Sequence, residues 1–335
     1  MKLSQLLRLA LWPFALLYGV HVRLRALLYA RGWLKQQRLK GVVISVGNLT
    51  VGGTGKTPLV IWLAEKLLAE GKRVAILSRG YRGAEGTSDE IEVLRFRLQN
   101  RVAFGVGKNR FASGQRLESQ QPVDVFLLDD GFQHLQLARD LDILLVDASR
   151  PMGTESLLPA GRLREPISAM SRADVLVFTR TETLPGTTEA IAKLREYPVF
   201  AAQTRLLGFR RLGGDLTLLA PEAIGAGPFL AFCGLGNPEA FFRDLVNWKF
   251  AVCGNMAFPD HHRFSASDVS RLQQAAKAAE ARALLTTEKD AQNLKGLKFH
   301  DPPVYVSVID FVIGPEADFL NILGKTVSAP RGAAA

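Results

Sequence analysis

The chain has 335 residues, a formal net charge of +10 at pH 7 and a hydrophobic share of 47%. This composition supports two domains with hydrophobic cores and excludes a disordered or low-complexity chain. With two cysteines and five histidines in no zinc-type spacing, neither a disulfide scaffold nor a structural zinc site is expected.

Residues 1–40 form a basic and apolar arm. They carry eight Lys or Arg residues and no Asp or Glu, which leaves the rest of the chain near +2 and argues against a protein-wide nucleic-acid surface. The uncharged run Leu9–Val20 is too short to cross a bilayer, which takes about 20 apolar residues. A signal peptide also has a short apolar core, but His21–Arg25 contains no small-x-small cleavage pattern. We expect an amphipathic helix docked on an anionic membrane; a helix packed on its own domain is the alternative.

A phosphate-binding loop is predicted after the first strand. The β-branched run Val42–Val46 is typical of a buried parallel strand, and helix-period leucines follow over Pro58–Glu70. The glycine-rich turn between them ends in Gly-Lys-Thr, and the backbone N–H groups of such a turn close around a polyphosphate. Lys56 would reach the β- and γ-phosphates, and the Thr57 hydroxyl would ligate Mg²⁺. The residues expected to hold the nucleotide are Asn48, Thr50, Val51, Gly52, Gly53, Thr54, Gly55, Lys56 and Thr57.

The usual loop pattern has a glycine where this chain has Thr50, and Gly52 and Gly53 supply the flexibility instead. The alternative interpretation of the segment is an ordinary glycine turn with an exposed lysine. The strand before it and the helix after it favour the phosphate loop.

Strand-like and helix-like runs then alternate over residues 41–199, which predicts a mostly parallel sheet with helices on both faces, as in P-loop NTPases. Further strands are expected at Arg73–Leu77, Val123–Leu128, Leu141–Val146 and Asp174–Phe178. Further helices are expected near Lys108–Glu118 and at Thr187–Tyr197.

The segment 200–228 is rich in glycine and proline and is expected to be a linker with short strands. A second series over 229–328 predicts a smaller α/β domain that closes a cleft, and a disordered tail is expected at 329–335. The strands expected in this domain are Phe229–Phe232, Phe250–Cys253, Leu284–Thr286 and Val304–Ile309. The helices expected there are Pro238–Trp248, Ala266–Ala283 and Pro315–Leu323.

Two adjacent acids, Asp129 and Asp130, follow the strand Val123–Leu128. Ligands bind beyond the carboxyl ends of strands in open α/β sheets, and phosphate-loop enzymes keep there the acid that holds Mg²⁺. Because adjacent side chains on an extended chain face opposite ways, one acid can serve the metal while the other points elsewhere. A strand that ends in a polar turn is the alternative.

Arg79 lies in a glycine-containing segment after the next strand. A guanidinium binds phosphate through two oxygens, so this segment suits an anionic substrate, and a solvated turn is the alternative. Asp89 and Glu90 follow in a segment expected to be a loop.

Residues of the second domain also carry candidate chemistry. Within 259–262, His261 follows a strand and either shares a proton with an acid or is a surface residue. The segment Thr286–Asp290 follows another strand and could bring a cation into the cleft.

Together these segments resemble the tetraacyldisaccharide 4′-kinase family of lipid A biosynthesis. They occur in the family's order over most of the chain. After the basic apolar N-terminus, the matching segments are 45–58, 78–81, 128–134, 158–166, 258–262 and 285–290.

The resemblance implies that ATP, with Mg²⁺, gives its γ-phosphoryl group to the 4′-hydroxyl of a tetraacylated disaccharide 1-phosphate. The expected place is the cytoplasmic face of the bacterial inner membrane, with peripheral contact to anionic lipid and with neither nucleic acid nor an obligate protein partner. In the family, Asp89 corresponds to the general base, although the Gly and Pro that flank the family's aspartate are absent here. His261 would work with an acid of the pair Asp129 and Asp130.

The site residues implied in this way form three groups. The catalytic group is Asp89, His261, Asp130 and Lys56. The substrate-binding group is Arg79, Tyr81, Arg164 and Glu165. The metal ligands are Thr57, Asp129 and Asp130.

Two other functions remain open on the sequence. A nucleotide-switching ATPase of the partitioning or metal-insertion kind also uses Gly-Gly-x-Gly-Lys-Thr, but usually carries a lysine where this chain has Val51. It also lacks a second domain with an Asp-His-His turn. A membrane-docked binding module without catalysis would have no need of Lys56, Thr57 and both aspartates.

Overall fold

The computed structural model describes residues 3–80, 88–149, 155–181 and 197–329. The chain divides into two compact units. The first consists of Met1–Tyr81, Leu98–Gln203 and Phe311–Ala335, and the second of Arg82–Arg97 and Thr204–Asp310. The expected boundaries differ from this division, because the second unit takes a segment from the first half of the chain and the C-terminal helix returns to the first unit.

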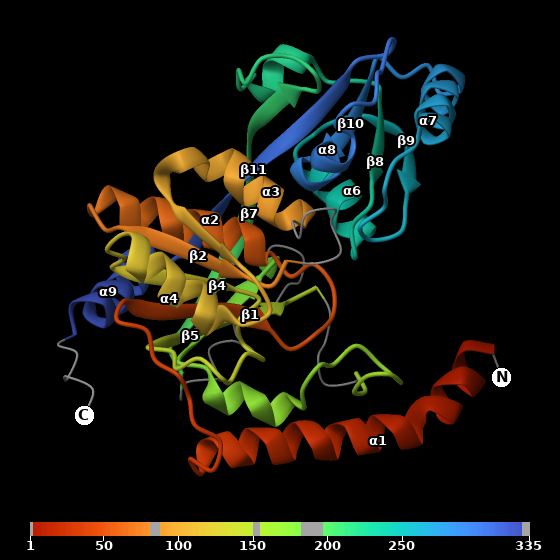
Figure 1. Ribbon diagram of the computed structural model, residues 1–335. Helices are drawn as coiled ribbons and strands as arrows, with labels where there is room; N and C mark the ends of the chain where they lie inside the picture. The colour runs from red at the N-terminus through yellow and green to blue at the C-terminus, as the bar shows by residue number, and fades with distance from the viewer. Residues whose placement is uncertain (1–2, 81–87, 150–154, 182–196, 330–335) are drawn as a thin grey trace. The chain divides into compact units, whose positions relative to one another are not determined.

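The first unit contains a parallel sheet with the strand order β3-β2-β4-β1-β5-β6, followed by the first part of β7 (Figure 1). Strands β1, β2, β4 and β5 are buried along their whole length, which explains their continuous apolar runs. The strand bounds are β1 Val42–Asn48, β2 Val74–Ser78, β3 Ala103–Val106, β4 Val125–Asp129, β5 Leu141–Asp147, β6 Val175–Thr179 and β7 Val199–Arg211. The short and half-buried β3 was not predicted.

Helices flank this sheet, as the sequence predicts. Helix α2 packs on β1 and β4, and α4 packs on β2 and β3. Helix α1 is a long helix along the outside of the unit, and it continues through Pro13 (Figure 1). The helix bounds are α1 Leu3–Ala30, α2 Lys56–Ala69, α4 Arg110–Gln120 and α9 Glu316–Ser328, with short 3₁₀ turns η2 Gln99–Arg101 and η4 Ile167–Arg172. No helix in the described ranges is long and apolar enough to span a membrane.

The second unit contains strands in the order β11-β10-β8-β9, paired in parallel where the register is defined. The strand bounds are β8 Phe229–Cys233, β9 Val252–Ala257, β10 Ala283–Thr287 and β11 Val304–Gly314. The helix bounds are α3 Asp89–Leu98, α6 Pro238–Asn247, α7 Ala266–Ala278 and α8 Glu288–Asn293, with the 3₁₀ turn η6 Pro221–Ile224.

Side chains that alternate along β8 pack into two hydrophobic cores of this unit. Phe229 belongs to the core that contains Leu245 of α6, whereas Phe232 belongs to the core that contains Leu272 of α7. Successive side chains of a strand point to opposite faces, so one buried strand supports a helix on each side.

One expectation for local structure was incomplete and another was wrong. The segment 200–228, expected to be a linker with short strands, begins inside the 13-residue strand β7, which runs to Arg211. Asp89 and Glu90 lie in the first turn of α3 and not in a loop. Ser88 Oγ accepts a hydrogen bond from the Ile91 backbone N–H at 3.3 Å, and acidic residues are favoured by the positive end of the helix dipole, so this helix begins here. The helix expected at 187–197 falls almost entirely outside the described residues.

Candidate active site

The phosphate loop and the acid pair lie at one edge of the first unit's sheet. Val46 of β1 is in register with Asp129 at the end of β4, and the two strands run parallel. The carboxyl ends of parallel strands meet at the same edge, so the loop that follows Asn48 begins close to the acids.

The loop has the backbone shape that a bound anion requires. Gly52 and Gly55 have φ of 110° and 89°, a left-handed conformation that favours glycine, and Gly55 precedes the first turn of α2. Among the described residues, a Cβ added at Gly53 would meet nothing within 4 Å, so the loop leaves space there. The Thr54 hydroxyl is buried and has no hydrogen-bond partner in the described part of the chain. An open cradle and an orphaned donor at a helix N-terminus fit a polyphosphate.

Lys56 is held at the mouth of this loop. Its Nζ donates to Asn48 Oδ1 at 3.2 Å and lies 3.4 Å from Asp130 Oδ1. Its side chain is only 10% exposed. The sheet edge therefore presents a fixed positive charge next to the loop.

The two acids of the pair have different surroundings. Asp129 is buried at the end of β4, whereas the Asp130 side chain is 36% exposed. Arg164 Nη1 donates to Asp130 Oδ1 at 2.9 Å and to Asp130 Oδ2 at 2.7 Å. Burial alone would raise the pKa of Asp130, but the charges of Lys56 and Arg164 outweigh it and lower that pKa. Asp130 also has φ of 54°, a strained backbone for a non-glycine residue that is common at functional sites.

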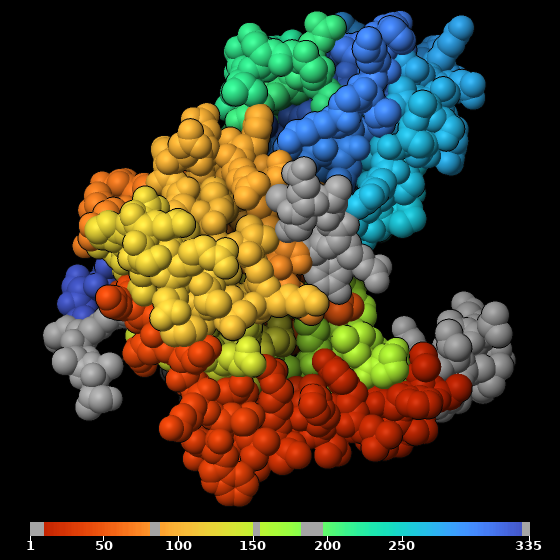
Figure 2. Space-filling model, viewed as in Figure 1, coloured from red at the N-terminus to blue at the C-terminus, as the bar shows by residue number. Residues whose placement is uncertain are grey.

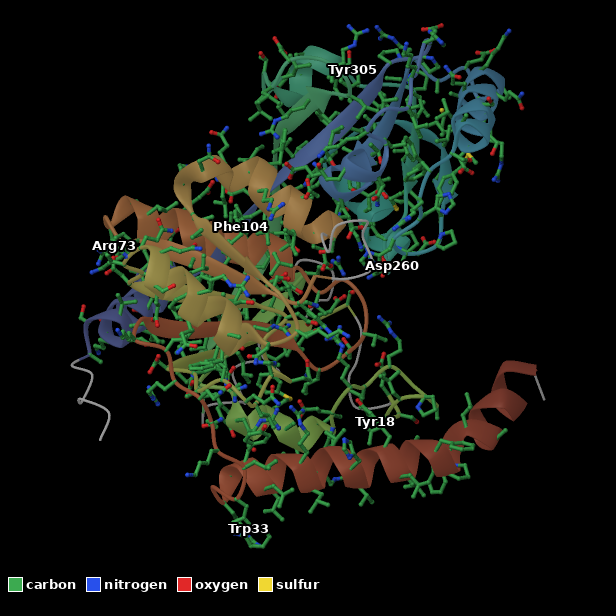
Figure 3. All side chains as sticks on the ribbon, viewed as in Figure 1. Tyr18, Trp33, Arg73, Phe104, Asp260 and Tyr305 are labelled. Carbon is green, nitrogen blue, oxygen red and sulfur yellow. The ribbon has the colours of Figure 1, made fainter. Side chains whose placement is uncertain are left out.

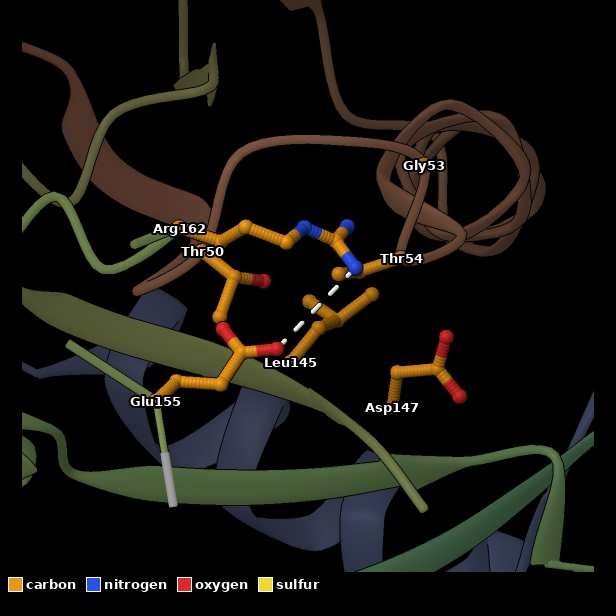
Figure 4. Close-up of a pocket in the computed structure, with 7 residues that line it drawn as sticks. All are labelled: Thr50, Gly53, Thr54, Leu145, Asp147, Glu155 and Arg162. Carbon is orange, nitrogen blue, oxygen red and sulfur yellow. Dashed lines mark ion pairs between the residues drawn. The ribbon is translucent and has the colours of Figure 1, made fainter. Parts of the chain in front are cut away.

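A small pocket borders the loop on the side of β5 (Figure 4). Its lining includes an ion pair between Arg162 Nη1 and Glu155 Oε1 at 4.0 Å. Arg162 Nη2 donates to Val51 O at 2.6 Å, and Val51 N donates back to Arg162 O at 2.8 Å. The backbone N–H and carbonyl of Val51 are thus both engaged by Arg162. Sequence reasoning missed Arg162 as a loop partner.

The expected substrate-binding residues fall into different positions. Arg79 is exposed just beyond β2, and Tyr81 lies outside the described residues. Arg164 engages Asp130 as described above. Glu165 is 3% exposed and pairs with Arg172 at 2.7 Å, an internal ion pair that turns its carboxylate away from solvent.

A second cluster of titratable groups lies within the second unit. His261 Nδ1 lies 3.0 Å from both Oδ1 and Oδ2 of Asp89. The Asp89 side chain is 4% exposed, and the imidazole is 47% exposed. The sequence predicted an acid of the pair after β4 as the partner of His261, but within its own unit its partner is Asp89.

The pair perturbs both pKa values. The hydrogen bond that His261 donates to Asp89 raises the pKa of His261 above its ordinary value, against the effect of burial. Burial would raise the pKa of Asp89, but the hydrogen bond from His261 and the charge of Lys289 lower it overall. The Asp89 carboxylate is therefore ionised, which is the form of a carboxyl group that can accept a proton.

His262, the next residue, is packed and hydrogen-bonded within its own unit. His262 Nε2 lies 3.1 Å from Asp268 Oδ2, and its ring stacks on Phe258 with centroids 4.8 Å apart. His261 instead has φ of 58°, and its ring contacts the Asp89 carboxylate. Of the two histidines, His261 has the environment of a functional group.

Helix α8 completes the surroundings of Asp89. From the sequence, the segment Thr286–Asp290 was expected only to supply a cation, and that cation is Lys289. Asn293 Nδ2 donates to Asp89 Oδ2 at 3.3 Å and was missed. Its position four residues after Lys289, on the same helical face, was the signal that could have found it.

Across the described ranges, no group of three or more His, Cys, Asp or Glu side chains could hold a metal by itself. This is compatible with Mg²⁺, which is usually bound through one or two carboxylates together with substrate phosphates and water. Thr57 at the start of α2 and Asp129 at the end of β4 carry oxygen atoms of the kind that Mg²⁺ prefers.

Comparisons with known proteins cover nearly the whole chain. Residues 7–328 match the family described as tetraacyldisaccharide-1-P 4′-kinase. The chain is 42% identical over 288 residues to a tetraacyldisaccharide 4′-kinase of Syntrophobacter fumaroxidans, covering 79% of this chain and 75% of that protein. It is 40% identical to the protein of the same name from Geobacter sulfurreducens over 314 residues, 88% of this chain and 87% of that one.

A solved structure is also similar. The crystal structure of LpxK from Aquifex aeolicus in complex with ATP aligns with a TM-score of 0.75 and 31% identity, over 96% of this chain and 99% of that one.

Proposed function

The chain belongs to the tetraacyldisaccharide-1-P 4′-kinase family, and from this membership we propose how its residues carry out the reaction. The protein is a kinase that uses ATP and Mg²⁺ to phosphorylate the 4′-position of a tetraacyldisaccharide 1-phosphate in lipid A biosynthesis. The observation that carries the proposal is the presence of the Lys56 loop together with the pair of Asp89 and His261.

The first unit supplies the phosphoryl donor. Backbone N–H groups from Gly52 to Thr57 bind the phosphates, and Lys56 neutralises charge as the γ-phosphoryl group leaves. Asn48 and Asp130 position the Lys56 ammonium before ATP binds, so little reorganisation is needed during transfer.

Thr57 and Asp129 are the proposed ligands of Mg²⁺, with Asp130 next to them. The bound ion would neutralise charge on the β- and γ-phosphate oxygens. Asp130 is also engaged by Arg164, and this ion pair keeps its carboxylate ionised. We propose Arg79 and Arg164 as contacts for the anionic acceptor, since guanidinium groups suit phosphate.

The second unit supplies the base. Asp89 accepts the proton of the acceptor's 4′-hydroxyl as the oxygen attacks the γ-phosphorus, and His261 donates a hydrogen bond that keeps the carboxylate oriented. Positioning and electrostatic stabilisation are the main contributions that phosphoryl transfer asks of a protein, and the base adds a place for the proton.

We further propose that α1 docks on the anionic surface of the inner membrane at its cytoplasmic face, where the acyl chains of the acceptor reside. Tyr18 points toward the body of the first unit, and its hydroxyl donates to Arg164 O at 2.8 Å, whereas Trp33 beyond the helix points away (Figure 3). Large apolar side chains are exposed along the helix, whose surface is red in Figure 2. These side chains are Trp12, Phe14, Leu16, Leu17, Val20, Leu24 and Leu27.

Together with Arg23 and Arg31, this face has the chemistry of a helix that lies in the headgroup region of anionic lipid. The helix sits against its own unit through Tyr18 and through Gly19, where a Cβ would meet Leu157 at 2.7 Å. One face of α1 therefore anchors it, and the other is available to lipid.

The function is tested by incubating the purified protein with radiolabelled ATP and the lipid disaccharide acceptor in vesicles. We expect label in the acceptor and little ATP hydrolysis in its absence. Hydrolysis that is equally fast without acceptor would instead identify a switch ATPase.

A further inference from the structure

Helix α8 presents two side chains to the buried carboxylate of Asp89. Lys289 Nζ lies 3.8 Å from Asp89 Oδ2, and Asn293 Nδ2 donates to the same oxygen at 3.3 Å. Residues four apart share one face of a helix, so both groups come from a single element. On the other side, Asp89 Oδ1 accepts from the Glu90 backbone N–H at 3.0 Å.

Lys289 also ties Asp89 to the loop that carries His261. Its Nζ donates to Asp260 Oδ1 at 2.8 Å, and Asp260 directly precedes His261. The Lys289 side chain is 17% exposed, so its ammonium is largely removed from solvent. It therefore lies between two carboxylates, one from α3 and one from the loop after β9.

The first turn of helix α8 is itself held in place by hydrogen bonds. Thr287 Oγ1 accepts from the Asp290 backbone N–H and donates to Asp290 Oδ2 at 2.6 Å. The Gly234 backbone N–H donates to Asp290 Oδ1 at 2.8 Å. These bonds hold the first turn of the helix against β8 and so define where the Lys289 ammonium lies.

Two cationic groups, Lys289 and the imidazole of His261, lie beside the buried Asp89 carboxylate. Burial opposes ionisation of this carboxylate, and the described titratable groups around it are His261, Lys289, Asp260, Glu90 and Asp290. His261 loses its charge as the pH rises through its pKa, whereas the pKa of Lys289 is raised, because Asp89 and Glu90 outweigh the effect of burial. Lys289 thus keeps its charge when His261 is neutral.

We propose that Lys289 is a positioning residue for phosphoryl transfer: its ammonium holds the Asp89 carboxylate ionised and links it to the Asp260–His261 loop, so that base and histidine keep one arrangement. The proposal rests on the assignment of Asp89 as the base. Lys289 touches neither ATP nor acceptor in this role and acts only through Asp89.

The test is the pH dependence of kcat/KM in Lys289→Met. Without the ammonium, Asp89 should hold its proton to higher pH, so the acidic limb of the profile shifts upward. kcat near pH 7 should fall by about tenfold or more while KM for ATP changes little, because the lost group perturbs the base and not the nucleotide loop. Lys289→Arg keeps the charge and should return the acidic limb toward its wild-type position.

The matched control is Lys295→Met, which removes an exposed lysine that pairs with Glu92 at 3.5 Å on the same unit. It should leave rate and profile unchanged. If the methionine variant does not fold, Lys289→Gln, which keeps a hydrogen-bond donor without the charge, takes its place.

An acidic limb that stays in place in the uncharged variant would overturn the proposal, even if the rate falls, because a merely structural role lowers the rate without moving the profile. The second readout is the pKa of His261 followed by NMR. It should rise further in Lys289→Met, because the charge of Lys289 opposes protonation of His261. Full activity of Asp89→Asn would instead refute the base assignment itself, whatever Lys289 does.

Discussion

His261 Nδ1 lies 3.0 Å from both carboxylate oxygens of Asp89, although the two residues are 172 positions apart in the chain. The contact joins the first residue of α3 to the loop after β9. It places a titratable donor against a buried carboxylate.

Asp89→Asn removes the proposed base with little change in shape. We expect kcat to fall by about 10²–10⁴-fold, the usual contribution of general base catalysis, with unchanged affinity for ATP. Steady-state kinetics and ATP titration by calorimetry measure the two quantities. Glu92→Gln on the same helix is the control, and a loss of equal size in that variant would show that the effect is not specific to Asp89.

The pKa of His261 should lie above its ordinary value of 6.5 in the wild type and fall toward it in Asp89→Asn, because the hydrogen bond to Asp89 is the main cause of the increase. NMR titration of the imidazole measures it, with His261→Gln to assign the signal. Because the folded-state pKa of His261 is raised, the contribution of its protonation to stability is present below about pH 6.5 while Asp89 is ionised, and it is lost as the pH rises through the folded value. A pKa that is the same in both proteins would contradict the contact.

Lys56→Met should reduce kcat by about 10³-fold or more and leave the fold intact, since the ammonium neutralises the leaving phosphate chain. Circular dichroism checks the fold, and label transfer to the acceptor measures the rate. Lys66→Met removes a lysine of the same helix that pairs with Glu316 at the surface, and we expect near-normal activity from it. Near-normal turnover of the Lys56 variant would remove the proposed donor mechanism.

Leu17→Glu places a charge on the exposed face of α1, where Leu17 is 69% exposed. Binding to vesicles with anionic lipid should weaken by about tenfold or more, because a carboxylate is repelled by the surface and loses apolar burial, while ATP affinity stays the same. Vesicle co-sedimentation measures binding. Leu216→Glu, a similarly exposed site at 62% in the second unit, is the control. Equal retention of all three proteins on vesicles would argue against docking through α1.

The error at Asp89 shows where local reasoning reached its limit. Ser88 is followed by the acids Asp89 and Glu90, a pattern that is typical of a helix start. The short polar segment before Ser88 nevertheless favoured a loop as the interpretation. The ion pair between Glu165 and Arg172 was also beyond local pattern, because Arg172 lies in a 3₁₀ turn that periodicity does not reveal.

The sequence by itself determined the phosphate loop, the buried strands before and beside it, and the carboxylates at the end of β4. These features depend on neighbouring residues: glycines that permit positive φ, β-branched runs that fit a buried sheet, and a helix that begins at Gly-Lys-Thr. Only the tertiary structure decided which cation faces which acid. Arg164 meets Asp130, and Lys289 with His261 meets Asp89, because separate segments are brought together by strand order and helix packing, and a period of two or 3.6 residues carries no information about such distant partners.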